Sequence, residues 1–306
     1  MSSRPVLAVV APGDMGHGLA AAFVAAGYRV VTALEGRSAR SRELARKAGM
    51  EDAGGLAEAV RQADLFLSVL PPDQALPLAR SVATAMRAQA RKPVYCDLNA
   101  VSPHTVQQIA ATIGEAGGRF ADGGIIGLNP QKDANGTRLY VSGPARAQVL
   151  ALAAEGVRFK DLGEEVGRAS ALKMCYAALT KGRFSLYATV ASAVAAMGLE
   201  AEWRAEMEGS QKATLQQIDA LVPRLPADAA RWVPEMQEIA ESFEAVGLSG
   251  HFHRGAGDIL SLLARTPFAA ESRETLDPTR SLADTVAAVL AARDGPDGPP
   301  IKPGGR

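Results

Sequence analysis

The sequence predicts an α/β domain with a doubly wound, mostly parallel sheet, followed by an all-α second half. Two observations predict this fold class. Short apolar runs alternate with helical patterns up to about residue 165, and the chain from there to Arg293 is rich in alanine and helical in pattern. A strand, a helix and another strand in repetition require parallel pairing through right-handed crossovers.

The strand-like runs are short and apolar, and the segments between most of them have helical periodicity. We predict strands at residues 6–10, 29–34, 65–70, 93–97, 118–122 and 137–142. We predict helices at residues 15–26, 38–48, 56–62, 73–90 and 103–116. A long loop with Asn129, Pro130, Asn135 and Gly136 separates the last two strands, which allows an antiparallel strand at the sheet edge.

The helical second half is interrupted at Gly198, at residues 223–226, at residues 247–250 and at Pro267. We therefore expect two domains, an α/β domain at residues 1–165 and a helical domain at residues 166–293. The tail at residues 294–306 is rich in glycine and proline, so we expect it to be disordered.

Composition excludes several classes of protein. The 33 basic and 33 acidic residues balance, and no Lys/Arg cluster is long enough to bind nucleic acid. Both cysteines, Cys96 and Cys175, lie in apolar segments, which favours a reduced, cytoplasmic protein without disulfides. No stretch is long enough to span a membrane, no signal peptide is expected, and no residues have metal-ligand spacing.

The most informative segment runs from the first strand into a glycine-spaced turn. Gly13 and Gly16 are three residues apart and precede a helix of small residues, but Ala11 replaces the first glycine of the G-x-G-x-x-G pattern. A dinucleotide pyrophosphate needs backbone amides at a helix N-terminus with no side chain in the way. A tight turn without a ligand is the alternative. The candidate cofactor-binding residues here are Gly13, Asp14, Met15 and Gly16.

The end of the second strand carries conflicting signals for the type of cofactor. Glu35 is near the position at which an acidic residue binds the ribose of NAD. Arg37 and Ser38 follow directly, with Arg40 close behind, and a guanidinium beside a hydroxyl suits a 2′-phosphate. We favour NADP over NAD, with Arg37 and Ser38 as its ligands. Ser38 alternatively only caps the next helix.

Carboxyl ends of parallel strands line the ligand crevice of such sheets. Leu70 and Pro71 follow the strand at 65–70 and are cofactor candidates. Asn99 follows the next strand and is expected to bond the nicotinamide amide or a substrate oxygen, whereas Asp97 is expected to structure the loop. Ser102 before Pro103 is a helix N-cap.

A glycine-rich segment at residues 122–127 is the candidate substrate loop. The backbone amides around Gly123 and Gly124 are suited to grip a carboxylate. An irregular strand with a bulge explains the same residues equally well.

The key catalytic candidate is Lys173, which lies within a mostly apolar helical run. A lysine there is costly unless its ammonium faces a cavity or a partner, and it can exchange a proton with a substrate oxygen while hydride moves. The alternative is a surface lysine whose aliphatic stem lies along the apolar surface while its ammonium group reaches solvent. Lys181 lies broadly on the same face and is a candidate for a substrate anion. His253, near His251 and Arg254, is a weaker substrate-binding candidate.

Four features resemble the β-hydroxyacid dehydrogenase superfamily of 3-hydroxyisobutyrate and 6-phosphogluconate dehydrogenases and tartronate semialdehyde reductases. They are the G-x-M-G core at 13–16, the V-L-P turn at 69–71, the D-x-x-x-x-S-P stretch at 97–103 and the helix bearing Lys173. The resemblance covers residues 6–265. Residues 231–238 and 250–256 are similar to a little-characterised branch with a phosphogluconate-dehydrogenase-like C-terminal domain.

The resemblance implies that residues 1–165 form a Rossmann-type NAD(P)-binding domain. It also implies that residues 166–293 form a helical substrate and dimerisation domain, which starts with an interdomain helix and completes the active site, commonly across a homodimer. The lysine of the family corresponds to Lys173. Asn99 and Ala100 replace the usual Ser-Thr pair, and Ala177 replaces an asparagine, so the departures from the family pattern lie on the substrate side. The expected function is NADP-dependent hydride transfer with a small polar carbonyl or hydroxy acid. The alternatives are imine reduction and a catalytically silent NADP-binding sensor or scaffold.

Overall fold

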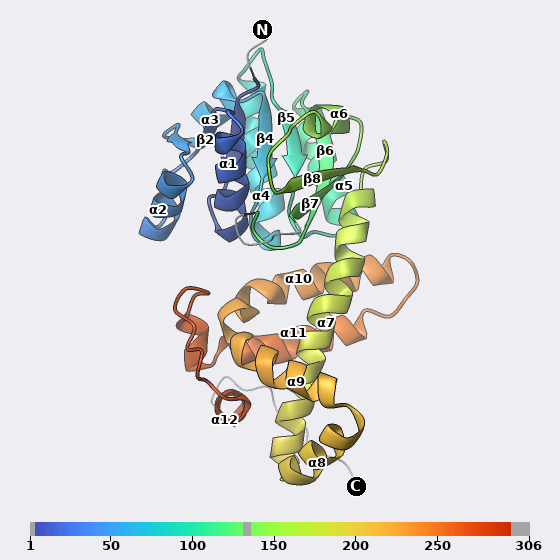
Figure 1. The fold of residues 1–306 in the computed structure, drawn as a ribbon. Helices are drawn as coiled ribbons and strands as arrows, with labels where there is room; N and C mark the ends of the chain where they lie inside the picture. Colours follow the sequence, from blue (N-terminus) through green and yellow to red (C-terminus); the bar gives the residue numbers. More distant parts are fainter. Residues whose placement is uncertain (1–3, 131–135, 295–306) are drawn as a thin grey trace. The chain divides into compact units, whose positions relative to one another are not determined.

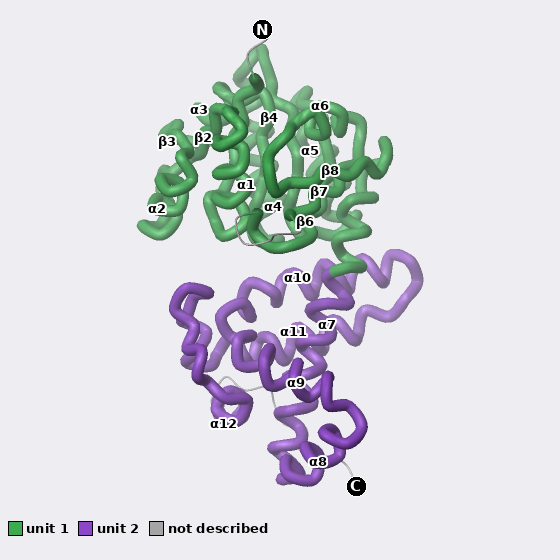
Figure 2. Tube along the Cα trace, in the orientation of Figure 1, with its two compact units in different colours: residues 1–176 green, residues 177–306 purple. Residues whose placement is uncertain are grey.

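The structure is a computed structural model that describes residues 4–130 and 136–294. The chain forms two compact units, residues 1–176 and residues 177–306 (Figure 2). The division between them falls inside one long helix, α7 (Arg168–Met197), whose first turns belong to the first unit. Apart from Asp294, the tail expected to be disordered lies outside the described residues, as does Asn135 of the expected loop.

The first unit is built on an eight-stranded sheet in the order β3-β2-β1-β4-β5-β6-β7-β8 (Figure 1). Its strands are β1 (Leu7–Val10), β2 (Val30–Thr32), β3 (Glu51–Asp52), β4 (Leu65–Ser68), β5 (Val94–Asp97), β6 (Arg119–Ile126), β7 (Thr137–Ser142) and β8 (Val157–Asp161). All neighbours pair in parallel except β6 and β7, which pair antiparallel. The predicted doubly wound, mostly parallel sheet is therefore confirmed.

Two strands are absent from the prediction, and both lie at the ends of the sheet. β3 consists of two exposed acidic residues, and β8 alternates charged and apolar positions, so neither has the buried apolar run by which the other strands were recognised. Because β8 continues the sheet beyond β7, the antiparallel strand β7 is not at the sheet edge as expected.

Helices cover both faces of the sheet, because alternate residues of each central strand point to opposite sides. Leu7 and Val9 of β1 pack in one apolar cluster with α1 (Asp14–Ala25), α2 (Ala39–Lys47) and α6 (Arg146–Leu150). Ala8 and Val10 pack in the other, with the remaining helices α3 (Leu56–Gln62), α4 (Pro72–Arg87) and α5 (Pro103–Glu115). Burial on both faces explains why the central strands β1, β4 and β5 are apolar except at the carboxyl ends of β4 and β5.

The second unit contains helices in its described part, as predicted. After the later turns of α7 come α8 (Glu200–Ser210), α9 (Lys212–Leu221), the 3-10 turn η1 (Val222–Arg224), α10 (Pro226–Glu244), α11 (His251–Ala264), the 3-10 turn η2 (Pro267–Ala270) and α12 (Leu282–Asp294). α7 ends before Gly198, which has a φ of +69°, a backbone conformation that residues with a side chain rarely adopt.

No helix in residues 4–130 or 136–294 is long and apolar enough for a membrane span.

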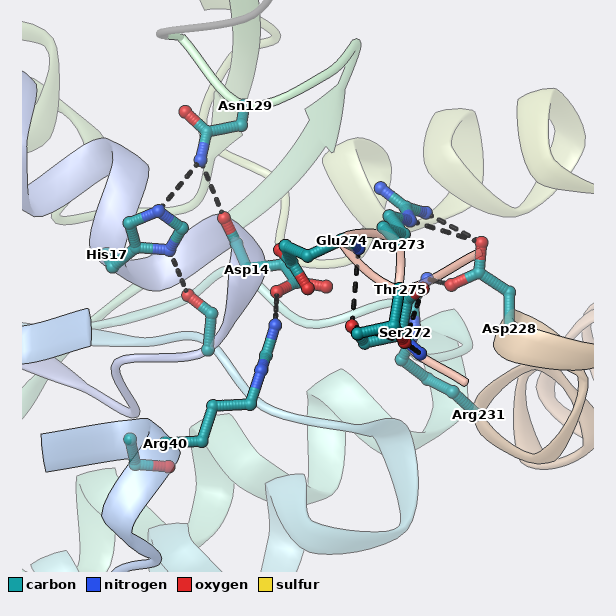
Figure 3. Close-up of polar contacts among 12 residues, drawn as sticks. Asp14, His17, Arg40, Asn129, Asp228, Arg231, Ser272, Arg273, Glu274 and Thr275 are labelled. Carbon is teal, nitrogen blue, oxygen red and sulfur yellow. Dashed lines mark hydrogen bonds and ion pairs between the residues drawn. The ribbon is translucent and has the colours of Figure 1, made fainter. Parts of the chain in front are cut away.

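Asp228 ties the start of α10 to the segment after η2 (Figure 3). Its carboxylate accepts hydrogen bonds from Arg231 at 2.5 Å and from Arg273 at 2.9 Å. Burial opposes the ionisation of Asp228, but the two guanidinium groups outweigh it and lower the pKa of this carboxyl. The pair of arginines therefore stabilises the unit most when Asp228 is ionised.

Candidate active site

The turn between β1 and α1 is shaped by its glycines. Gly13 is the N-cap of α1 and offers no side chain to its first amides, and a Cβ on Gly13 would meet no atom within 4 Å. A Cβ on Gly16 would overlap the carbonyl oxygen of Ala11, so this position requires glycine. The first turn of α1 thus presents backbone N–H groups without a side-chain cap, the arrangement in which an anion binds at a helix N-terminus.

Side chains from two other segments hold this turn (Figure 3). The Nδ2 group of Asn129 donates to the carbonyl of Asp14 at 2.8 Å, and the ring of His17 lies 2.8 Å through Nδ1 from the carbonyl of Gly13. A Cβ on Gly18 would overlap the amide of Asn129, so Gly18 makes room for that contact. The carboxylate of Asp14 pairs with Arg40 from the start of α2, at 2.5 Å.

The residues after β2 take different directions. The Glu35 carboxylate lies against the start of α3, with Oε2 3.1 Å from where a Cβ on Gly55 would be. Ser38 caps α2 by accepting a hydrogen bond from the amide of Ser41 at 3.2 Å. Within the described part of the chain, the half-buried Arg37 guanidinium has no hydrogen bond or ion pair, so it is available to a ligand.

The ends of β4 and β5 are joined by one buried side chain, Asn99. Its Oδ1 accepts from the amide of Leu70 at 2.5 Å, and its Nδ2 donates to Ser68 and to Asp97, each at 2.8 Å. Asn99 is only 2% exposed. These bonds engage its amide within the protein, so Asn99 fixes the shape of the edge at Leu70. Pro71 follows as the exposed N-cap of α4.

Asp97 structures its loop as expected, because its Oδ1 accepts from the amide of Asn99 at 3.0 Å. Ser102 also acts as expected: its hydroxyl accepts from the amide of Thr105 at 3.1 Å and caps α5, in which Pro103 is the first residue.

Gly123 and Gly124 lie inside β6 and are buried. They stand in unbroken register with Val141 and Tyr140 of β7, so the segment has neither the bulge nor the open loop considered from the sequence. A Cβ on Gly123 would overlap Leu98. The two glycines therefore contribute space at the sheet edge for neighbouring atoms.

Lys173 lies against that space. A Cβ on Gly124 would be 2.8 Å from the carbonyl oxygen of Ala169 and 3.1 Å from the Cβ of Lys173. Asp97, the last residue of β5, is in register with Asp122, so Gly124 lies beyond the carboxyl end of β5. The half-buried Lys173 is therefore held at the edge of the parallel sheet where the glycine turn of α1 also lies.

Two predicted substrate residues belong to the second unit. Lys181 of α7 forms an ion pair with Glu235 of α10, and the two side chains are 13% and 5% exposed. The Lys181 ammonium also lies 5.3 Å from the ring centroid of Trp232. A substrate anion at Lys181 would therefore share the ammonium with a buried carboxylate, a feature that the sequence pattern did not reveal.

His253 is 7% exposed and lies between aromatic rings, 4.9 Å from Phe243 and 5.1 Å from Phe252. Burial lowers the pKa of His253, and a hydrogen bond with the backbone of Ala178 opposes this change. His253 also lines a cavity of about 420 Å³ between α10 and α11, together with Gln237, Arg254 and Asp258. Arg254 is engaged there by Glu244 and Gln237 at 2.6 Å each.

The two cysteines have opposite surroundings. Cys96 is fully buried in β5, where burial and the nearby Asp97 and Asp122 carboxylates raise the pKa of its thiol. Cys175 is exposed on α7, and neither thiol is in a disulfide. Within the described ranges, no three His, Cys, Asp or Glu residues are grouped as a metal site would require.

Sequence reasoning did not assign a role to Asp122, Arg40, Asn129 or Glu235. An acidic residue within an otherwise apolar, glycine-containing strand is a signal that could have identified Asp122, because a buried carboxylate requires donors. The contacts of Arg40, Asn129 and Glu235 join distant segments, and no local pattern encodes them.

The fold and the glycine turn define an α/β protein of the dinucleotide-binding class. Residues 6–154 match the family described as the NAD binding domain of 6-phosphogluconate dehydrogenase, and residues 195–263 match a domain of unknown function, DUF1932. The first domain of this chain is thus similar to the NAD-binding domains of the 6-phosphogluconate dehydrogenase type.

One curated relative, an uncharacterized 28.5 kDa protein in the 7S RNA 5′ region of Methanothermus fervidus, is 30% identical over 170 residues. The match covers 56% of this chain and 63% of that protein. The conserved protein MTH1747, of unknown function and structurally similar to 3-hydroxyacid dehydrogenases, is 25% identical with a TM-score of 0.60, over 84% of this chain and 97% of that one.

Two further solved structures share the fold at lower identity. Mycobacterium tuberculosis 3-hydroxyisobutyrate dehydrogenase with L-serine is 20% identical with a TM-score of 0.64, over 95% of this chain and all of that one (100%). A reductive aminase from Aspergillus terreus in complex with NADPH and ethyl levulinate is 19% identical with a TM-score of 0.51. The match covers 94% of this chain and 99% of that one. At these identities, the two structures show that this chain shares their fold.

Proposed function

We propose that this protein is an NADP-dependent oxidoreductase that interconverts a small polar carbonyl compound and the corresponding alcohol, with Lys173 as the general acid and base. The observation that carries the proposal is the place of Lys173. It is half-buried, it packs on Gly124 beyond the end of β5, and it shares this sheet edge with the uncapped glycine turn of α1.

The residues present fit a dinucleotide. The space at Gly13, the required glycine at position 16 and the uncapped amides of α1 suit a pyrophosphate. Asp14 would repel that anion, but its carboxylate is paired with Arg40. Arg37 is available to a 2′-phosphate, and Glu35 is directed at α3, so both support NADP over NAD. Met15, Leu70 and Pro71 would contribute the remaining surface.

The chemistry assigned to the chain is a proton transfer. When bound, the nicotinamide supplies a hydride to the carbonyl carbon, or accepts one from the alcohol carbon. In the reductive direction, the Lys173 ammonium gives its proton to the carbonyl oxygen, so that the substrate gains one hydride and one proton. In the oxidative direction, the neutral amine of Lys173 takes the proton from the hydroxyl oxygen.

Candidate groups for substrate recognition lie in each unit. Gly123 and Gly124 leave space beside Lys173 in the first unit. In the second unit, the candidates for recognition of a polar group are Lys181, which is paired with the buried Glu235, and the buried His253, which lies between aromatic rings. These assignments agree with a small polar substrate.

An NADPH-consumption screen over aldehyde acids, keto acids, sugar acids and cyclic imines tests this function. We expect turnover with a carbonyl acid and a loss of that turnover in Lys173→Ala. Turnover with cyclic imines alone would replace the proposal with imine reduction. Tight NADPH binding without turnover of any class would instead indicate a sensor or scaffold.

We also propose that the protein acts as a homodimer in the cytoplasm and uses an exposed apolar face of α7. Leu179, Leu186 and Met197 are 74%, 46% and 70% exposed. They recur at whole numbers of helical turns and include the half-buried Val190 in the same row. An apolar row of this kind on a soluble protein is typical of an interface, and two copies in an isologous pair would cover it.

A further inference from the structure

The start of α7 is held by a carboxylate from a distant strand, that of Asp122 in β6. Its Oδ2 accepts from the backbone amides of Gly167, Ala169 and Ser170 at 2.9, 3.0 and 3.2 Å. Its Oδ1 accepts from the hydroxyl of Ser170 at 2.6 Å. Asp122 is fully buried, and the donors of α7 compensate the cost of burying its charge.

This arrangement differs from an ordinary cap, which comes from the residue just before the helix. The backbone at Gly167 has a φ of +103°, so the chain turns sharply there and aims its amides at β6. Ser142 of β7 reinforces the junction, because its hydroxyl donates to Asp122 at 2.9 Å and accepts from the amide of Ala169 at 3.2 Å. Two strands of the sheet thereby fix the first turn of α7.

The same strand also contacts the lysine. Asp122 and Gly124 are two residues apart in β6, so they lie on the same face of the strand. Gly124 meets the Cβ of Lys173, which is one helical turn after Ser170. β6 therefore sets the axial position of α7 through Asp122 and the distance of Lys173 from the sheet through Gly124.

We propose that Asp122 is the positioning residue for Lys173. It fixes the first turn of α7, so that the ammonium of Lys173 is held where a substrate oxygen can receive its proton. This inference rests on the proposed function, because it assigns Asp122 an effect on the rate only through Lys173. Misplacement of a catalytic group by about 1 Å can cost on the order of 100-fold in rate.

A double-mutant cycle with Asp122→Asn and Lys173→Ala tests the proposal with a carbonyl substrate found in the screen. The asparagine is nearly isosteric, but its NH₂ group would face the donors of α7. We expect Asp122→Asn to lower kcat by about 10- to 100-fold, with the KM of the substrate and the Kd of NADPH unchanged. In the Lys173→Ala background, the same substitution should lower kcat no further.

Ser170→Ala is the milder second variant, because it removes one donor to Asp122 and leaves the backbone bonds. It should lower kcat in the same direction and also lose its effect in the Lys173→Ala background. Ser281→Ala, which removes the hydroxyl that accepts from the amide of Asp284 at the start of α12, is the matched control. It should reduce stability by a similar amount and leave kcat unchanged.

The outcomes separate the two proposals. If Lys173→Ala retains wild-type turnover, the proposed function is wrong, whatever Asp122 does. If Lys173→Ala loses turnover but Asp122→Asn and Ser170→Ala keep a wild-type kcat, the positioning role is wrong. Equal losses from Asp122→Asn with and without Lys173 would also overturn it, since they would show a structural effect independent of the lysine.

Discussion

The carboxylate of Asp14, in the first turn of α1, is paired with the guanidinium of Arg40, near the start of α2, at 2.5 Å. The pair joins the first turn of α1 to the first turn of α2, beside the glycine turn. The two side chains are 38% and 50% exposed, and exposed pairs of this kind contribute only about 0–1 kcal/mol. A bound phosphate can therefore compete for Arg40 at low cost, which bears directly on the choice of cofactor.

We expect Arg37→Ala to weaken NADPH binding by about 10- to 100-fold, because one charge-assisted contact contributes roughly 1.5–3 kcal/mol. NADH binding should change little, since NADH lacks the 2′-phosphate. Arg40→Ala should have a smaller effect of the same kind. Fluorescence titration of both cofactors measures these affinities.

Arg46→Ala is the matched control, because this arginine lies in the last turn of α2 and is already paired with Glu43. Its NADPH affinity should equal that of the wild type. Tighter binding of NADH than of NADPH, together with no loss in Arg37→Ala, would contradict the preference for NADP.

Lys173→Ala should lower kcat for the carbonyl substrate by about two to four orders of magnitude and leave the Kd of NADPH unchanged. The reason is that the substitution removes the proton donor while the glycine turn stays intact. Steady-state assays and NADPH titration separate the two quantities. Lys160→Ala, on the exposed edge strand β8, is the control and should be as active as the wild type. A fully active Lys173→Ala would exclude the lysine from the chemistry.

The stability of the protein should fall in acid partly through His253. Its pKa in the folded protein is below the ordinary value of 6.5, because burial disfavours the imidazolium. Below pH 6.5 the unfolded chain therefore binds the proton more readily than the folded one. The free energy of unfolding should then decrease as the pH falls from about 6.5 through the lower folded pKa.

His253→Gln removes this titration, so its unfolding free energy should depend less steeply on pH in that range, even though the variant is less stable overall. Urea unfolding at a series of pH values between about 5 and 7 measures the slope. His251→Gln, at an exposed position two residues earlier, should keep the wild-type slope. Equal slopes for His253→Gln and the wild type would contradict the assignment.

The order of strands and helices in the first unit could be predicted because its central strands are buried on both faces and its turns need glycine. The same logic missed β3 and β8, whose edge positions remove the apolar signal. The sequence also indicated which strand ends would carry polar residues. It could not indicate that the amide of Asn99 would be engaged by Ser68, Asp97 and Leu70.

Long-range polar contacts account for most of what the sequence left undetermined. From the sequence, Lys181 is expected to be a cation on a helix face that can bind a substrate anion. In the structure, the carboxylate of Glu235 on α10 pairs with it. From the sequence, Asp122 is expected at the start of a glycine loop, but it caps α7 and accepts from the amide of Gly167, 45 residues later. Such pairs depend on how distant elements pack, and neither periodicity nor spacing encodes that packing.

The apolar row on α7 leads to the last prediction. Leu179→Glu places a charge at a side chain that is 74% exposed, so it should cost a folded monomer little. In a dimer that buries this row, the same charge would lose its hydration without a partner and would weaken association. Sedimentation velocity at micromolar concentration should therefore show a dimer for the wild type and a monomer for Leu179→Glu. Leu248→Glu, an exposed leucine after α10, is the control and should remain dimeric. A wild-type protein that sediments only as a monomer would rule out the dimer.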